Sequence, residues 1–202
     1  MYLCTGGEAF VSVAYVISQR VKRLKKGQPF VGTKFASVGS RSAVNKALSK
    51  LVLAGLLKRV ARGVYMRPKL NSYFGPVRPS PLTVMKVITT ANGETIQVHG
   101  AEAVRRLGLS TQMQVLPTYY TSGSSREIKI GIALVRLKHV SKDRLQHAGT
   151  NLGLVLTALH YVGKRGMSKE ILSKITDTLS NEEFRKLLDC KMPKWMRSCL
   201  TS

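Results

Sequence analysis

Residues 39–65 read GSRSAVNKALSKLVLAGLLKRVARGVY, and this stretch decides the fold of the N-terminal part of the chain. Its apolar residues first recur at intervals of three and four, which predicts a helix over 41–54 with one buried stripe. Ser40 is a favourable N-cap for this helix, and Gly55 is suited to end it. Two short β-prone runs follow, and they predict a hairpin because Gly63 can take the positive φ of its turn.

Upstream, the pattern predicts two further helical segments. Val13, Ile17, Val21 and Leu24 repeat at helical spacing and form one apolar face, which predicts a helix over 13–24. Residues 31–37 are long enough for one or two helical turns. Three helical segments followed by a basic hairpin is the order of a winged helix-turn-helix, so residues 1–70 are predicted to form such a DNA-binding domain.

The candidate DNA contacts are polar and cationic residues of this predicted domain. The exposed face of the recognition helix carries hydroxyl, amide and cationic groups without a carboxylate, which suits phosphates and the base edges of the major groove. Its candidate residues are Ser40, Arg41, Ser42, Asn45, Lys46, Ser49 and Lys50. The cations expected on the DNA backbone are Arg20, Lys22, Arg23, Lys25, Lys26 and Lys34. The arginines that line the predicted hairpin are Arg59, Arg62 and Arg67.

The charge balance favours a polyanionic partner. The chain has 33 Lys and Arg against 10 Asp and Glu, a net charge of +23. Residues 1–80 hold 15 of these cations and a single acid, Glu8, whereas acids are interspersed in the rest of the chain. A merely solubilising charge would be mixed with acids throughout, so the nucleic-acid contact is expected in the first segment.

A membrane partner is not expected. No uncharged apolar run approaches the roughly 20 residues that a membrane-spanning helix needs. The apolar stretch 9–17 follows Glu8, where a signal peptide would carry positive charge. We therefore expect a cytoplasmic protein.

The second half predicts an α+β domain. Residues 71–80 contain prolines and are expected to form a linker, with the second domain over 81–202. Residues 114–120 and 127–137 alternate in polarity and are predicted to be strands of an antiparallel sheet. From Lys142 onward the pattern is helical to the end of the chain, and it includes a capping box formed by a Ser-x-x-Glu sequence.

The sequence contains no recognisable catalytic or metal-binding motif. The histidines and cysteines lack the spacing of metal ligands, and no pair of acids has the arrangement of an active site. The turn 122–126 could cradle a phosphate through backbone N–H groups, although a Ser/Gly-rich turn is far more often only a turn. We expect no catalysis, no metal and no cofactor.

Three stretches resemble AbiEi-type antitoxins of type IV toxin–antitoxin systems. Residues 39–65 resemble their winged-helix domain. Residues 108–112 (GLSTQ) and 119–131 (YYTSGSSREIKIG) resemble the second domain of a short subgroup of that family. By position, the resemblance assigns four residues to the wing: Lys58, Arg59, Arg62 and Tyr65.

The resemblance implies an antitoxin that represses its own operon by binding inverted repeats of double-stranded DNA in the promoter, where a homodimer could form. It also implies a paired nucleotidyltransferase toxin that is countered without a stable complex. Two alternatives stay open. One is a stand-alone transcriptional regulator whose C-terminal domain senses a ligand or dimerises. The other is a protein that binds structured RNA, which an aromatic content of only 6% disfavours.

Overall fold

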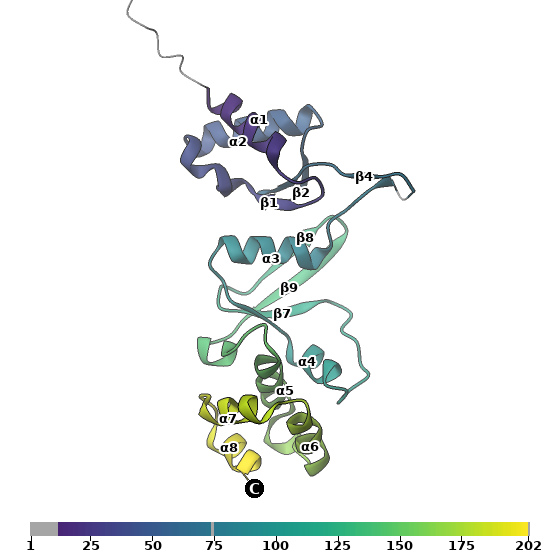
Figure 1. Cartoon of the computed structure of the whole chain (residues 1–202), viewed down its shortest axis with the longest axis vertical. Helices are drawn as coiled ribbons and strands as arrows, with labels where there is room; N and C mark the ends of the chain where they lie inside the picture. Colours follow the sequence, from purple (N-terminus) through teal and green to yellow (C-terminus); the bar gives the residue numbers. More distant parts are fainter. Residues whose placement is uncertain (1–11, 74, 202) are drawn as a thin grey trace, which may run out of the picture. The chain divides into compact units, whose positions relative to one another are not determined.

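The computed structural model describes residues 12–73 and 75–201 (Figure 1). These residues form two compact units, with the boundary between Ala91 and Asn92. Both helices and sheets are present, so the protein belongs to the α+β class. Within the described residues, no helix is both long enough and apolar enough to cross a membrane.

The first unit begins with three helical segments and a small sheet. Its elements are α1 (Val13–Arg23), β1 (Pro29–Val31), the 3₁₀-helical segment η1 (Gly32–Val38), α2 (Arg41–Leu53), β2 (Lys58–Ala61) and β3 (Val64–Met66). The strands form an antiparallel sheet in the order β1-β3-β2, with a bulge between Arg59 and Ala61. The helical segments expected at 13–24, 31–37 and 41–54 and the hairpin around Gly63 are thereby confirmed.

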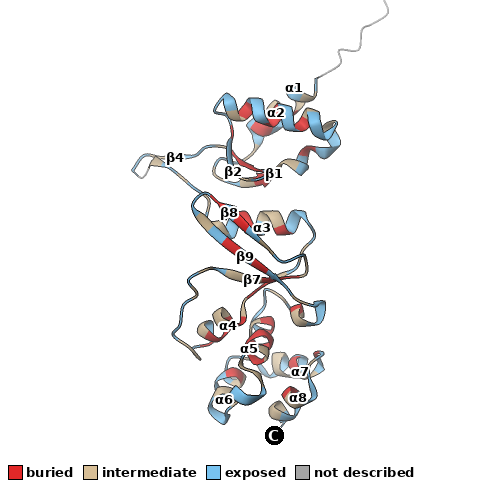
Figure 2. Cartoon of the chain, turned by 180° about the vertical axis from the view of Figure 1, so that it is seen from behind, coloured by how far each residue is buried: buried red, intermediate tan, exposed pale blue. Residues whose placement is uncertain are grey.

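The core of this unit lies between the helices and the sheet. Ile17 of α1 and Leu48 of α2 are completely buried, and Phe35 of η1 packs edge-on against Phe30 with 5.8 Å between ring centroids. Figure 2 shows buried and exposed residues alternating along α2, as expected for an amphipathic helix. The polar face of α2 is therefore held in the solvent by the packing of its apolar face.

The cap at the start of α2, the glycine after it and the turn of the hairpin lie at the residues that the sequence predicted. The hydroxyl of Ser40 accepts a hydrogen bond from the Ala43 N–H (3.3 Å) and caps α2. Gly63 takes a φ of 72° in the β2–β3 turn, and Gly55 takes 70° after α2. Glycine adopts this left-handed conformation without the steric cost that other residues incur.

Arg67 has a structural role. It was expected among the basic side chains lining the hairpin, but its Nη1 donates to the carbonyl oxygens of Lys22 (2.6 Å) and Leu24 (2.7 Å) at the end of α1. The Arg67 carbonyl in turn accepts from the Gly27 N–H (2.9 Å). A cation at these carbonyls satisfies acceptors that the helix leaves open and complements its dipole. Arg67 therefore joins α1 to the strand β3.

Replacing Arg67 with alanine should lower the free energy of unfolding by roughly 1.5 kcal/mol, because two charge-assisted hydrogen bonds are lost. Lysine at this position should restore only part of the loss, since an ammonium group lacks the planar geometry of guanidinium. Urea unfolding of the three proteins measures both effects. Equal stability of Arg67→Ala and the parent protein would show that the contact contributes nothing.

The segment after the hairpin differs from a simple linker. The strands β4 (Leu70–Asn71) and β5 (Gly75–Pro76) pair as a short antiparallel ladder, and α3 (Pro81–Ala91) follows. Because α3 contacts β1, it groups with the first unit. The second unit therefore starts at Asn92, eleven residues beyond the start at residue 81 that was expected for the second domain.

The second unit contains a four-stranded sheet and a helical C-terminal part. Its elements are β6 (Ile96–Val98), α4 (Gly100–Arg106), β7 (Thr118–Thr121), β8 (Arg126–Ile130), β9 (Ala133–His139), η2 (Lys142–Leu145), α5 (Asn151–Gly166), α6 (Lys169–Asp177), α7 (Asn181–Asp189) and α8 (Lys194–Thr201). The strand order is β6-β7-β9-β8. The expected helical C-terminus is confirmed, and Ser180 and Glu183 form the predicted capping box.

Two expectations about this sheet were wrong. Residues 127–137 are not one strand, because a two-residue turn at Gly131 and Ile132 separates β8 from β9. The sheet is also not purely antiparallel, since β7 pairs with β9 in parallel. The polarity alternation continues through the exposed Ile132, and it therefore hides the turn in the sequence.

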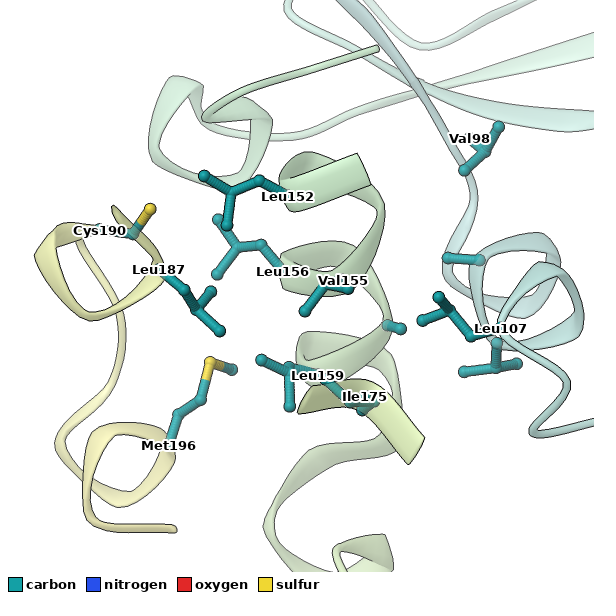
Figure 3. Close-up of a cluster of buried hydrophobic side chains, with 13 residues drawn as sticks. Val98, Leu107, Leu152, Val155, Leu156, Leu159, Ile175, Leu187, Cys190 and Met196 are labelled. Carbon is teal, nitrogen blue, oxygen red and sulfur yellow. The ribbon is translucent and has the colours of Figure 1, made fainter. Parts of the chain in front are cut away.

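Helix α5 is the centre of the second core. Figure 3 shows its apolar side chains between Val98 and Leu107 on one side and Leu187 and Met196 on the other. Leu159 is completely buried. The helix is interrupted near its end at Gly163, whose φ is 68°.

On α4, Glu102 forms ion pairs with Arg105 and Arg106, each at 2.8 Å. The hydrogen bond from Arg105 is the main reason that the pKa of Glu102 falls to about 2 from 4.5, with Arg106 adding to it against the opposing effect of burial. A carboxylate with a lowered folded-state pKa stabilises the fold above its unfolded pKa. We therefore expect the stability advantage over Glu102→Gln to be complete above pH 4.5 and to be lost as the pH falls to about 2.

Urea unfolding of the two proteins across this pH range measures that advantage. A difference in unfolding free energy that stays constant down to pH 2 would contradict the assignment.

Candidate nucleic-acid interface

A groove of about 750 Å³ lies between η1, α2 and the β2–β3 hairpin. Its lining residues are Gly32, Thr33, Ala36, Gly39, Arg41, Val44, Asn45, Ser49, Arg59, Arg62, Gly63 and Tyr65. The groove thus joins residues from the predicted recognition helix and the predicted wing. The groove is also lined by Thr33 and Ala36 of η1. The sequence did not indicate these two residues, because a segment this short shows no periodicity.

The helix contributes three polar side chains to the groove. Arg41, Asn45 and Ser49 are spaced by four residues and therefore lie on one face of α2. All three are exposed, while the neighbouring apolar stripe is buried in the core. A guanidinium, an amide and a hydroxyl are the side-chain groups that hydrogen-bond to base edges and phosphates.

The hairpin is held close to the start of η1. The N–H of Gly32 donates to the carbonyl oxygen of Gly63 at 2.9 Å. A Cβ atom at position 32 would lie 3.1 Å from Leu48 and 3.3 Å from the ring of Tyr65, which is tighter than ordinary packing. Glycine at this position therefore allows the hairpin to approach the helix and sets the width of the groove.

Several predicted contacts lie outside the groove lining. Ser42, Lys46, Lys50 and Lys58 are exposed but do not line it. The Ser40 hydroxyl caps α2, and it also lies 3.1 Å from the Ser42 hydroxyl.

Tyr65 is mainly a core residue. Its side chain is only 7% exposed, and its ring lies 6.2 Å from that of Phe30. It therefore presents little more than an edge to the groove.

The predicted backbone cations form a separate group. Those on α1 and the loop after it are exposed and do not line the groove: Arg20, Lys22, Arg23, Lys25 and Lys26. Lys34 is exposed on η1. Residues 12–91 contain no Asp or Glu, so no carboxylate within this range can neutralise these cations. The ion pairs identified in the described residues all lie in the second unit.

Comparison with known protein families gives a match over most of the chain. The matching model is described as a family of unknown function, DUF6088, and it covers residues 16–187. The chain belongs to the DUF6088 family. The crystal structure of the RV2827C protein from Mycobacterium tuberculosis is similar, with a TM-score of 0.46 and 14% identity over 92% of this chain and 75% of that one. No curated protein matches at a significant level. The resemblance to AbiEi-type antitoxins stays a prediction.

The Ser/Gly turn of this DUF6088 protein already holds an internal carboxylate. Glu94, whose side chain is 9% exposed, accepts from Arg126 (2.6 Å) and from the Thr121 hydroxyl (2.8 Å). A Cβ atom at Gly123 would lie only 2.6 Å from this carboxylate. Burial raises the pKa of Glu94, but the hydrogen bonds from Arg126, Asn92 and Thr121 outweigh it and lower the pKa overall. The turn is thus occupied where a phosphate would have to lie.

The described part of this DUF6088 protein has no cluster of three His, Cys, Asp or Glu residues that could hold a metal ion. His99 accepts at Nδ1 from the Ala101 N–H (3.3 Å), which caps α4, and lies 2.8 Å from Gln114 Nε2. Burial, assisted by Lys138, lowers the pKa of His99. Its hydrogen bonds give this histidine a structural role.

Proposed function

We propose that the first unit of this protein is a winged helix-turn-helix that binds double-stranded DNA. The observation that carries the proposal is the groove in which Arg41 and Asn45 of α2 face Arg59 and Arg62 of the hairpin. Three helical segments followed by the β2–β3 hairpin is the order expected of this class of domain. In this proposal α2 enters the major groove and the hairpin lies along the backbone.

The electrostatics of the unit support a phosphate-rich partner. Gly39 and Arg41 both line the groove, so the first turn of α2 lies at its edge. The N-terminus of a helix attracts anions through its free N–H groups and its dipole. Residues 12–91 contain no Asp or Glu that could neutralise the cations of α1, which favours additional, sequence-independent contacts to phosphates.

We further propose that the protein represses its own operon and acts as an antitoxin, as its resemblance to AbiEi-type antitoxins implies. In that role it would bind inverted repeats, with a homodimer on the DNA, and counter a nucleotidyltransferase toxin without a stable complex. A neighbouring reading frame for such a toxin would favour this role over that of a stand-alone regulator.

The test is binding of the full chain to DNA from upstream of its own gene, measured across a range of salt concentrations. Random duplex and structured RNA serve as competitors. Tight binding that survives random duplex supports an autoregulator. Equal competition by random DNA would reduce the unit to a non-specific basic surface, and preferential competition by RNA would favour the RNA-binding alternative.

A further inference from the structure

The second unit contains a cavity of about 280 Å³ that the proposed DNA contact does not use. Its polar lining comes from three elements: Ser141, Asp143 and Arg144 at η2, His160 of α5, and Lys191 in the loop before α8. Two cations, a hydroxyl and an imidazole therefore surround one small space. The single acid in the lining, Asp143, lies 3.5 Å from Lys191.

The walls of the cavity are fixed to one another. The side-chain amide of Gln146 donates to the carbonyl oxygen of Lys191 (2.9 Å) and accepts from the Lys191 N–H (2.9 Å). It also donates to the Asp143 carbonyl oxygen (2.6 Å). These bonds join η2 to the loop before α8, so the site is formed before any ligand arrives.

His160 presents a buried polar atom without a partner. Among the described residues, its Nε2 is one of two buried side-chain nitrogen or oxygen atoms that lack a hydrogen-bond partner. Burial, assisted by the charge of Arg144, lowers the pKa of His160 to about 4, so the ring is neutral near pH 7. Buried polar atoms in native proteins nearly always have a partner. His160 lines the cavity, and a polar ligand there that reaches this nitrogen would supply such a partner.

The two cations are placed to receive an anion. The guanidinium of Arg144 lies 5.8 Å from the centre of the Tyr120 ring, a cation–π distance that restrains the side chain. The ion pair between Lys191 and Asp143 is exposed on both sides, and exposed pairs of this kind are weak. Lys191 can therefore leave Asp143 for a more highly charged ligand.

We propose that this cavity binds the phosphate group of a phosphate monoester through Arg144, Lys191 and His160. Arg144 would bind two phosphate oxygens side by side, Lys191 would contribute a second cation, and His160 would donate from Nε2. A phosphate offers three terminal oxygens to these donors, whereas a carboxylate offers only two. The site does not depend on DNA binding by the first unit.

The test is a titration of the ¹⁵N-labelled full chain with inorganic phosphate, monitored by NMR. A parallel titration with acetate is the comparison. Saturable shifts are expected at the amides of residues 141–144, 191 and 192 and at the His160 ring. Acetate should bind more weakly at the same residues. Shifts confined to the basic first unit, or equal affinity for acetate, would overturn the proposal.

Three variants sharpen the test. Arg144→Ala should weaken phosphate binding about tenfold through loss of a charge-assisted contact. Asp143→Asn should strengthen binding several-fold, because it removes the competing acid while leaving a side chain of the same size. Lys142→Ala changes an exposed cation of η2 that does not line the cavity, and it should leave binding unchanged. Unchanged binding by both Arg144→Ala and Asp143→Asn would place the phosphate elsewhere.

Discussion

Replacing Arg41 or Asn45 with alanine is expected to weaken binding to the specific DNA site by about 1–3 kcal/mol each and to relax sequence preference. Both side chains line the groove from one face of α2, and neither is needed for the core. Each can make paired hydrogen bonds to a base edge, so its loss should affect the specific sequence more than random duplex. The affinities for the specific site and for random duplex, measured at one salt concentration, give the sequence discrimination of each variant directly.

The matched controls are Lys25→Ala and Lys26→Ala. These residues are exposed in the loop after α1, outside the groove. Their loss should weaken binding to all sequences alike and reduce the slope of affinity against salt, as expected for phosphate contacts. Equal losses on specific and random DNA for Arg41→Ala and Asn45→Ala would show that this face of α2 does not read bases.

Replacing Gly153 with alanine should lower the free energy of unfolding by about 3 kcal/mol, the upper range for overpacking a tight site. A Cβ atom there would overlap the backbone carbonyl of His147 and would lie 2.8 Å from Gln97 Nε2. That carbonyl cannot move freely, because it accepts from the Thr150 hydroxyl (2.7 Å) and from the Thr150 N–H (3.1 Å). His147 itself adopts a φ of 52°, which indicates a turn already held in an uncommon conformation.

The expected loss of stability in Gly153→Ala is informative because helix propensity alone predicts a gain in stability. Alanine in a helix interior is favoured over glycine by about 1 kcal/mol. Gly166→Ala, at the exposed end of the same helix, is the control and should change stability by less than about 1 kcal/mol. Thermal and urea unfolding followed by circular dichroism give both values. A Gly153→Ala variant as stable as the parent would show that the turn before α5 can move aside.

The sequence alone was sufficient to predict the features that depend on residues close to one another along the chain. The apolar stripe of α2, its cap at Ser40, the turn at Gly63 and the capping box at Ser180 were all predicted correctly. Each depends on residues no more than four positions apart, and hydrogen bonding and side-chain spacing over that distance follow directly from helix and turn geometry. The spacing of α2 likewise placed Arg41, Asn45 and Ser49 on one polar face, and these three residues line the candidate groove.

Only the tertiary structure decided which distant residues became partners. Arg67 was expected to line the hairpin, but it donates to carbonyl oxygens at the end of α1, up to 45 residues away. Similarly, the Ser/Gly turn resembled a phosphate cradle, but Glu94, 27 residues before Thr121, supplies its anion. A side chain's charge and size are written in the sequence, whereas its partner depends on which surfaces the packed core brings together.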